Sequence, residues 1–205
     1  MPKIVDKDAK KNDIIQAALT VFAKKGVANA KMADIAKAAG IGKGTIYEYF
    51  RDKNEIFFES FNHFIEMIDM TMGRRLYRLT DPVDKLKAFF EGWGEIIDAS
   101  GSDYIEIMLE FWAEGIRHNH DIAAAAGPIN LKQLYEDFRG MIQGILEEGI
   151  RQGKFREMNT TLTAAMLIGT LDGLMLQWIL DKTIFSIGEV WNHLLDEFLN
   201  GIARH

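Results

Sequence analysis

The chain lacks cysteine altogether and has only three prolines among its 205 residues. Without cysteine it forms no disulfide and carries no thiolate nucleophile, as is common in a reducing cytoplasm. Proline breaks helices, and in its place residues of high helix propensity such as Ala, Leu, Met, Glu and Lys are abundant. The composition therefore predicts an all-α fold.

Long apolar runs are missing as well. The best candidate, residues 164–180, is interrupted by Thr170, Asp172 and Gln177, whereas a membrane-spanning helix needs about 18 consecutive apolar residues or more. Residues 1–8 are charged and contain no apolar segment typical of a secretory signal. We therefore expect a cytoplasmic protein that does not span a membrane.

Positive charge is in the minority, since the net charge is −6, but it is unevenly distributed. Residues 1–55 carry 11 Lys and Arg against 7 Asp and Glu, whereas residues 56–205 carry 13 against 23. A basic segment on an acidic protein indicates a candidate nucleic-acid contact, although a solvated basic tail would look the same. The N-terminal end is therefore the predicted DNA-binding end.

Apolar residues recur at helical spacing along most of the chain. Gly26, in a left-handed conformation, and Gly153 are expected to end two of the helices, and Asp81-Pro82 is expected to begin another. A weak turn is expected over residues 120–126. The expected helices span residues 9–25, 32–39, 43–50, a long segment from 54, 82–99, 103–117, a segment after Gly127-Pro128 that ends at 152, 161–181 and 186–203.

Residues 32–50 meet the requirements of a helix-turn-helix. This motif needs a small residue where two helices cross, a glycine in the turn, and apolar residues at fixed offsets. Many helical hairpins satisfy part of the pattern, so a purely structural pair of helices is an open alternative. The residues that fit the motif are Ile35, Ala36, Ala39, Gly40, Ile41, Ile46 and Tyr49.

Three stretches of this region resemble the TetR family signature almost position for position: IQAALTVFAKKG at 15–26, DIAKAAGIGKGTIYEYF at 34–50 and KNEIF at 53–57. The later segments EFWAE and LDGL resemble the family less specifically. The resemblance implies a helix-turn-helix DNA-binding domain over residues 1–53 and a larger helical ligand-binding and dimerisation domain over residues 54–205.

The same resemblance implies which residues contact DNA. It places Lys43, Gly44 and Thr45 at the N-terminus of the recognition helix, where free N–H groups favour phosphate oxygens. Gly44 would permit close approach to DNA, and Thr45 and Tyr47 are candidates for base contact. The implied DNA-binding residues are Lys31, Lys43, Gly44, Thr45, Tyr47, Tyr49 and Lys53.

An alternative is open at Tyr49, and the chain departs from the family pattern at Lys31 and at Gly42. For Tyr49, packing inside the helix-turn-helix is the competing interpretation. Lys31 and Gly42 depart from the Thr or Ser that the family commonly places there as helix caps. The charged Lys31 side chain would contact phosphate in place of the missing hydroxyl. Gly42 has no side chain and cannot make such a contact.

The last two helices predict a subunit interface. The segment 186–203 has an unbroken apolar row, and the segment 161–181 is apolar on nearly every side and must be covered on both faces. One cover is the chain's own core, and the other is the same pair of helices from a second subunit, as in the family. Asp172 is the polar exception, expected to bond to a neighbouring helix end or, alternatively, to contact a ligand. The predicted interface residues are Leu162, Met166, Gly169, Gly173, Trp191, Leu195 and Phe198.

Large aromatic and methionine side chains are frequent between residues 61 and 141, and most are expected to be core. The family resemblance implies a ligand pocket among these helices, and the lack of a clearly buried Lys or Arg favours an apolar or neutral inducer. The run 118–121 contains two histidines but no partnered third ligand, so we expect no metal and no cofactor. The predicted pocket residues are Trp93, Met108, Phe111, Trp112 and Phe138.

These inferences together predict a repressor, not an enzyme, that binds an inverted-repeat DNA operator as a homodimer and responds to a small molecule. The two recognition helices would enter successive major grooves, roughly 34–36 Å apart. Ligand binding would shift the population away from that spacing or, if the ligand prefers the DNA-binding state, towards it. Two alternatives stay open. One is a helical protein-interaction module, whose binding would depend little on salt, and the other is a helical enzyme, for which no catalytic arrangement is identifiable.

Overall fold

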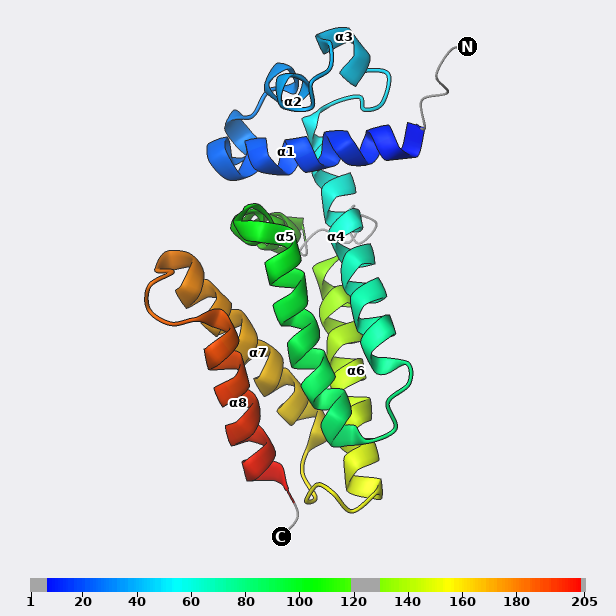
Figure 1. Cartoon of the computed structure of the whole chain (residues 1–205), viewed down its shortest axis with the longest axis vertical. Helices are drawn as coiled ribbons and strands as arrows, with labels where there is room; N and C mark the ends of the chain where they lie inside the picture. The colour runs from blue at the N-terminus through cyan, green and yellow to red at the C-terminus, as the bar shows by residue number, and fades with distance from the viewer. Residues whose placement is uncertain (1–6, 119–129, 204–205) are drawn as a thin grey trace. The chain divides into compact units, whose positions relative to one another are not determined.

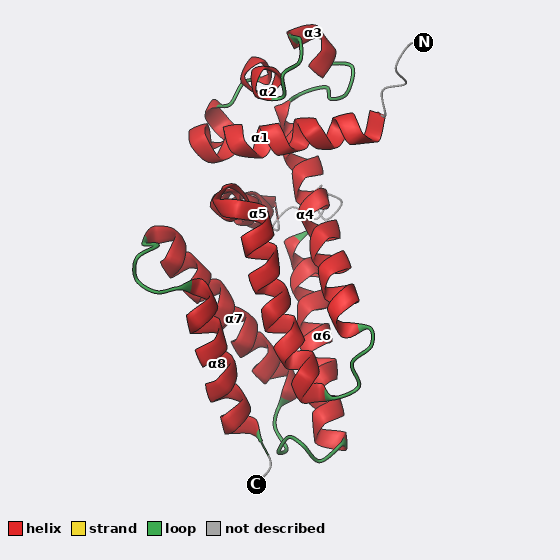
Figure 2. Ribbon diagram, in the orientation of Figure 1, coloured by secondary structure: helices red, strands yellow, loops and turns green. Residues whose placement is uncertain are grey.

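A computed structural model describes residues 7–118 and 130–203, and within these ranges every regular element is a helix (Figures 1 and 2). The all-α prediction is confirmed. In the same ranges the β-type contact is an isolated antiparallel bridge between Phe155 and Ala203. The helices are α1 (Lys7–Asn29), α2 (Met32–Ala38), α3 (Lys43–Ile46), α4 (Lys53–Leu76), α5 (Pro82–His118), α6 (Leu131–Arg151), α7 (Thr160–Leu180) and α8 (Ile187–Ile202).

Gly153 follows the end of a helix as the sequence predicts, whereas Gly26, predicted to end the first helix, bends it and the helix continues to Asn29. Gly26 adopts a φ of 72° and kinks α1 near its C-terminal end, and Gly153 adopts a φ of 71° just beyond α6. Both angles lie in the left-handed region, which glycine enters without the steric cost of a Cβ. The bounds of α7 and α8 agree with the predicted ranges to within one residue.

Two predicted helices differ from the structure. The α-helix of segment 43–50 ends at Ile46, and the chain continues in tighter turns in which Tyr47 N–H bonds to the Gly44 carbonyl at 3.1 Å. The predicted break at 101–103 is wrong, because α5 runs through it. A glycine costs a helix interior only about 1 kcal/mol, and no proline enforces a stop there. The predicted turn at 120–126 lies outside the described residues.

The chain forms two compact units. Unit 1 comprises residues 1–66 and 100–130, and unit 2 comprises residues 67–99 and 131–205. This division differs from the predicted boundary after residue 53, because α4 and α5 each contribute to both units.

The core of unit 1 joins α1 to parts of α4 and α5 through aromatic rings. Phe22 meets Phe57 edge-on with ring centroids 6.0 Å apart, and Phe111 lies 4.8 Å from Phe57 and 5.1 Å from Phe61. All four rings are buried. Burial of such rings supplies much of the apolar area that stabilises a small helical unit.

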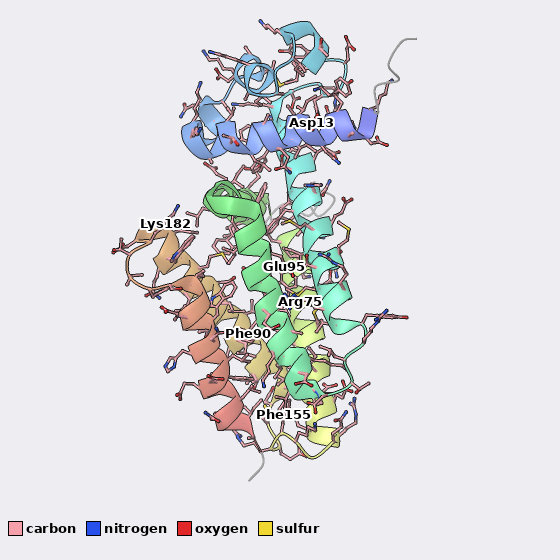
Figure 3. All side chains as sticks on the ribbon, viewed as in Figure 1. Asp13, Arg75, Phe90, Glu95, Phe155 and Lys182 are labelled. Atoms are coloured by element: carbon pink, nitrogen blue, oxygen red, sulfur yellow. The ribbon has the colours of Figure 1, made fainter. Side chains whose placement is uncertain are left out.

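The core of unit 2 is built from parts of α4 and α5 together with α6, α7 and α8. Trp191 and Leu195 on α8 are buried, so they attach this helix to the core. Gly149 on α6 lies against the ring of Phe155, and that ring occupies the place that a Cβ would take. This close approach constrains the chain between the end of α6 and Phe155, which Figure 3 labels.

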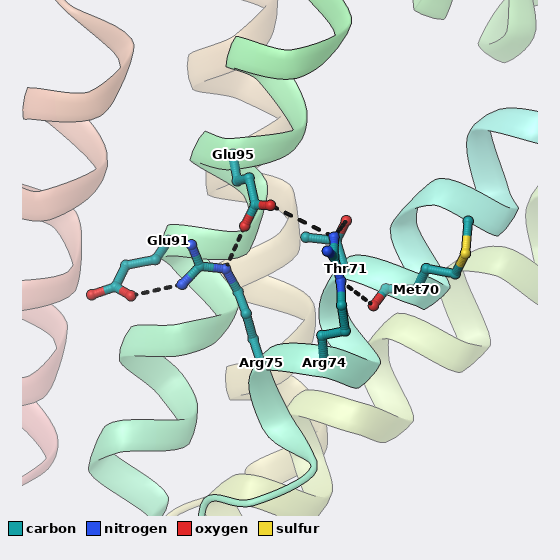
Figure 4. Close-up of polar contacts among 6 residues, drawn as sticks. All are labelled: Met70, Thr71, Arg74, Arg75, Glu91 and Glu95. Carbon is teal, nitrogen blue, oxygen red and sulfur yellow. Dashed lines mark hydrogen bonds and ion pairs between the residues drawn. The ribbon is translucent and has the colours of Figure 1, made fainter.

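An ion-pair network joins the end of α4 to α5 within unit 2 (Figure 4). Arg75 donates from Nη1 to Glu91 Oε2 and from Nε to Glu95 Oε2, both at 2.9 Å. Arg74 Nη2 lies 3.6 Å from Glu95 Oε1. An added Cβ on Gly92 of α5 would lie 2.9 Å from Met72 Sδ, so the two helices pack closely here.

Among the described residues, α7 has the length and apolar composition that would suit a membrane span. It packs against α6 and α8 in unit 2. Thr170, Asp172 and Gln177 interrupt its apolar surface, as the sequence shows. Part of that apolar surface, including Leu162 and Met166, nevertheless faces away from the core of unit 2 and is exposed.

Candidate nucleic-acid interface and effector domain

The helix-turn-helix is assembled as the sequence predicts. Ile35, Ala36 and Ile46 are buried between α2 and α3. Gly40 takes a φ of 64° in the turn, and Ile41 N–H bonds to the Ala36 carbonyl at 3.0 Å. The left-handed glycine lets the chain reverse tightly enough to bring α3 against α2.

The start of α3 is open to solvent. Gly42 is its N-cap, in an extended conformation and without a side-chain cap. Lys43 and Gly44 are exposed, and a Cβ added to Gly44 would meet no atom within 4 Å. A backbone this accessible, next to a cation, suits contact with a phosphate backbone.

Three further predicted contact residues lie on or just after α3. Tyr47 is 51% exposed, which is unusual for so large a ring and leaves it available for DNA. Thr45 and Tyr49 are half-buried. Both interpretations of Tyr49, packing and contact, are compatible with that exposure.

Lys31 is exposed at the N-cap of α2, and its backbone rather than its side chain forms the cap. Its N–H donates to Asp34 Oδ2 at 3.2 Å, and Asp34 Oδ1 pairs with Lys25 Nζ at 2.9 Å. The hydrogen bond from Lys25 is the main cause that lowers the pKa of Asp34. The Lys31 ammonium is left to project from this surface.

Lys53 has a structural role that the sequence did not reveal. Its Nζ donates to the carbonyls of Val27 at 2.7 Å and Ala28 at 2.6 Å, at the end of α1. These bonds satisfy carbonyls that the helix leaves unpaired and lock α4 to α1. No spacing in the sequence signals this contact, because the kink at Gly26 determines where the carbonyls lie.

The predicted interface residues divide into exposed and buried groups. Leu162 and Met166 on α7 are 61% and 72% exposed, and Gly169 is exposed beside them. Trp191 and Leu195 are buried in their own subunit, and Gly173 and Phe198 are half-buried. Two exposed apolar residues, Leu176 and Leu180, continue the α7 row and were not predicted, although their helical spacing signals them. Ile184, in the turn after α7, is exposed as well.

The predicted pocket residues fall in both units. In unit 2, Trp93 and Phe138 meet edge-on with centroids 5.5 Å apart. The buried Trp93 Nε1 finds no hydrogen-bond acceptor among the described residues. In unit 1, Met108 and Phe111 are buried and Trp112 is half-buried.

Asp172 on α7 accepts a hydrogen bond from the Tyr135 hydroxyl of α6 at 2.7 Å. The predicted partner, a helix end, is therefore wrong, and a tyrosine one helix away takes its place. Burial raises the pKa of Asp172, and the hydrogen bond from Tyr135 opposes that rise. Of the predicted histidine run, residues 119–121 lie outside the described residues, and the part of the chain that is described contains no group of metal-ligating side chains.

Comparison with protein families assigns both parts of the chain. Residues 14–59 match the family of bacterial regulatory proteins of the tetR type, and residues 82–204 match the C-terminal domain of BetI-type transcriptional repressors. The chain belongs to the TetR family. It is a DNA-binding transcriptional regulator of the ligand-responsive kind.

One curated relative and two solved structures of the same fold are similar to nearly the whole chain. The regulator BetI of Proteus mirabilis is 29% identical over 202 residues, which cover 98% of this chain and 94% of BetI. A transcriptional regulator from Saccharomonospora viridis, solved with choline, has 22% identity and a TM-score of 0.81, with 97% and 100% coverage. FadR of Bacillus subtilis, solved with stearoyl-CoA, has 24% identity and a TM-score of 0.72, with 93% and 98% coverage.

Proposed function

We propose that this TetR-family regulator is a cytoplasmic repressor that binds an inverted-repeat operator as a homodimer and is released by a small molecule. The observation that carries the proposal is the exposed surface of α3, where Lys43, Gly44 and Tyr47 stand clear of the protein. Lys43 and the backbone at Gly44 would contact phosphate and set the register, and Tyr47 and Thr45 would reach base edges.

The homodimer is supported by the apolar row on α7. Leu162, Met166, Leu176 and Leu180 are exposed on this helix, and an isolated subunit would leave them in water. A two-fold axis would bring the row against its own copy, and Gly169 beside it would allow the helices to approach closely. Two subunits joined in this way would present two copies of α3 to the two halves of the operator.

The effector would bind among the aromatic residues of the predicted pocket. Trp93 and Phe138 are the best supported residues of the pocket. The Nε1 of Trp93 is buried and has no hydrogen-bond acceptor among the described residues, and a ligand oxygen could act as that acceptor. Met108, Phe111 and Trp112, which lie in unit 1, are proposed separately as ligand-contact residues of that unit. An apolar or neutral ligand is favoured, so neutral apolar compounds are tested first. Choline, a cation, and stearoyl-CoA, an anion, are the ligands of the two solved relatives and serve as comparisons.

The ligand would act by population shift. A ligand that prefers the conformation with altered α3 spacing would draw the dimer away from the operator-binding state. A coupling of about 1–3 kcal/mol would change DNA affinity roughly 5–150-fold.

A salt series of DNA binding tests the proposal. Purified protein is titrated onto the DNA that flanks its own gene, as wild type, as Lys43→Gln and as Lys87→Gln. Lys87 is an exposed lysine of unit 2, so its variant matches the change in net charge. We expect affinity to fall steeply with salt and the slope to shrink by about one in Lys43→Gln alone. If an intact dimer binds neither this DNA nor random DNA at low salt, the protein-interaction module is favoured instead, unless the operator lies elsewhere or a corepressor is needed.

A further inference from the structure

The surface of α3 and of the turn after it carries an acidic residue, Glu48, that the proposed function leaves without a role. Glu48 follows Tyr47 directly and lies four residues after Gly44, about one helical turn further along the chain. Its N–H donates to the Thr45 carbonyl at 3.1 Å, which holds it in the turn after α3. The exposed residues of the segment 43–50 are Lys43, Gly44, Tyr47 and Glu48.

The burial of this segment determines which way Glu48 faces. Ile46 and Phe50 are buried within unit 1, and Thr45 and Tyr49 are half-buried. The exposed residues therefore occupy the side that points away from the core of this unit. A recognition helix enters the major groove with its exposed side, so Glu48 would enter together with Tyr47.

The Glu48 carboxylate differs from the other acids of residues 31–55 in having no partner. It forms no hydrogen bond or ion pair with the described residues. Each of the other three acids accepts at least one hydrogen bond from a nearby side chain or backbone N–H, and these acids are Asp34, Asp52 and Glu55. The Glu48 oxygens are thus available to a group from outside the protein.

The chemistry of DNA limits what that group can be. Phosphate oxygens repel a carboxylate, so Glu48 opposes the attraction that Lys43 exerts on the DNA backbone. In the major groove, however, cytosine presents its N4 amino group and adenine its N6 amino group as donors. The adenine donor lies beside the N7 acceptor, which repels a carboxylate, whereas cytosine presents the donor alone. Cytosine is therefore the base that a glutamate selects.

We propose that Glu48 is a specificity-determining residue that accepts a hydrogen bond from the N4 amino group of one cytosine in each half of the operator. This inference rests on the proposed binding of α3 to an inverted-repeat operator. Lys43 would supply attraction to phosphate and the position of the helix, and Glu48 would supply the choice of base at one position. Because phosphate repulsion offsets part of the contact, Glu48 would reject wrong bases more than it raises affinity.

Selection of binding sites from a random pool of duplex DNA tests the proposal with the full chain. Wild type, Glu48→Ala and Glu48→Gln are compared, and single-site affinities are then measured by anisotropy. We expect the wild-type motif to contain in each half a C·G pair whose exchange weakens binding about tenfold. Glu48→Ala should lose the preference at that pair alone. Glu48→Gln should prefer adenine there, because glutamine pairs with adenine N6 and N7.

Glu66→Gln is the matched control for the loss of one negative charge. Glu66 is an exposed residue of unit 1, about 20 Å along α4 from Lys53 at a rise of about 1.5 Å per residue. This variant should select the wild-type motif. Thermal midpoints of both Glu48 variants should equal that of wild type, because the Glu48 side chain is exposed and unbonded.

Affinity for random DNA gives a second measurement. Removal of a carboxylate from the DNA-facing surface should tighten this binding about two- to fivefold at low salt in Glu48→Ala, and Glu66→Gln should change it less.

The outcomes separate this proposal from the proposed function. The same motif from wild type and both Glu48 variants would overturn the role of Glu48 and leave operator binding intact. Loss of a preference for a base other than cytosine would overturn it too, as would an equal loss in Glu66→Gln. Failure of the wild type to select any motif would overturn the operator binding, and the role of Glu48 with it.

Discussion

The exposed surface of α3 and the exposed surface of α7 have opposite chemistry. The first presents Lys43, a bare backbone at Gly44 and the half-exposed ring of Tyr47. The second presents Leu162, Met166 and further aliphatic side chains. A polyanion suits the first and another apolar surface suits the second, so each surface indicates the chemistry of its partner.

The difference also concerns how each surface is held. The backbone around α3 is fixed by local features: the left-handed Gly40, the Asp34–Lys25 pair and the two bonds from Lys53 to α1. The α7 row depends only on helical spacing and on packing of the opposite face. Mutations should therefore affect the two surfaces in different ways.

The largest expected effect is on assembly. Met166→Asp would place one carboxylate from each subunit in the apolar interface. An unpaired buried charge costs about 3–5 kcal/mol, which here would be lost from the free energy of dimer formation. We expect monomers by light scattering coupled to size exclusion. Met70→Asp is the matched control, since Met70 is 62% exposed on α4, away from the row. Dimers that persist in Met166→Asp would contradict the α7 interface.

The next effect concerns the bonds that hold α4 to α1. Lys53→Met removes a charged donor from two carbonyls, and we expect the free energy of unfolding to fall by about 1–3 kcal/mol. Lys43→Gln should leave that free energy unchanged, because the Lys43 side chain is exposed. Urea titrations of both variants measure the difference. Equal stability in the two variants would mean that Lys53 has no structural role.

A pair of glycine variants separates folding from DNA contact. Gly40→Ala places a Cβ at a φ of 64°, and this should cost about 1–2 kcal/mol of unfolding free energy. Gly44→Ala meets no atom of the protein and should keep or slightly raise stability. It should nevertheless weaken DNA binding if DNA approaches that backbone. Full DNA affinity in Gly44→Ala would remove the argument for close approach.

The smallest effect is a pH dependence at Asp172. Because burial raises its pKa in the folded state, the folded protein loses stability as pH rises through that value. Asp172→Asn cannot ionise and still accepts the Tyr135 bond. We expect the variant to be more stable than wild type at neutral pH and equal to it below the pKa of unfolded aspartate. Unfolding free energies measured across that range test this, and the opposite pH trend would contradict it.

Much of the helix-turn-helix could be predicted residue by residue. Its buried positions and the turn glycine follow from short spacings, and Ile35, Ala36, Gly40 and Ile46 lie as expected. The short length of α3 was not predicted, because periodicity does not distinguish an α-helical turn from the tighter turns after Ile46.

The second half of the chain could be predicted mainly as a helix pattern. An apolar residue on a helix faces either the core or a partner, and periodicity alone does not say which. Trp191 was therefore grouped with Met166, although one is buried in its own subunit and the other is exposed. Contacts between distant residues, such as Lys53 with Val27 and Asp172 with Tyr135, had no local signal at all.

The central claim is that α3 and the turn that follows it contact DNA, and a comparison of two tyrosines tests it most directly. Fluorescence anisotropy would measure binding of the flanking DNA to wild type, Tyr47→Ala and Tyr77→Ala at low salt. Tyr77 is 87% exposed in the segment after α4 and serves as the control for loss of a surface ring. The account predicts that Tyr47→Ala loses about tenfold or more in affinity and that Tyr77→Ala loses none. Equal affinity of Tyr47→Ala and wild type for DNA that the wild type binds specifically would contradict it.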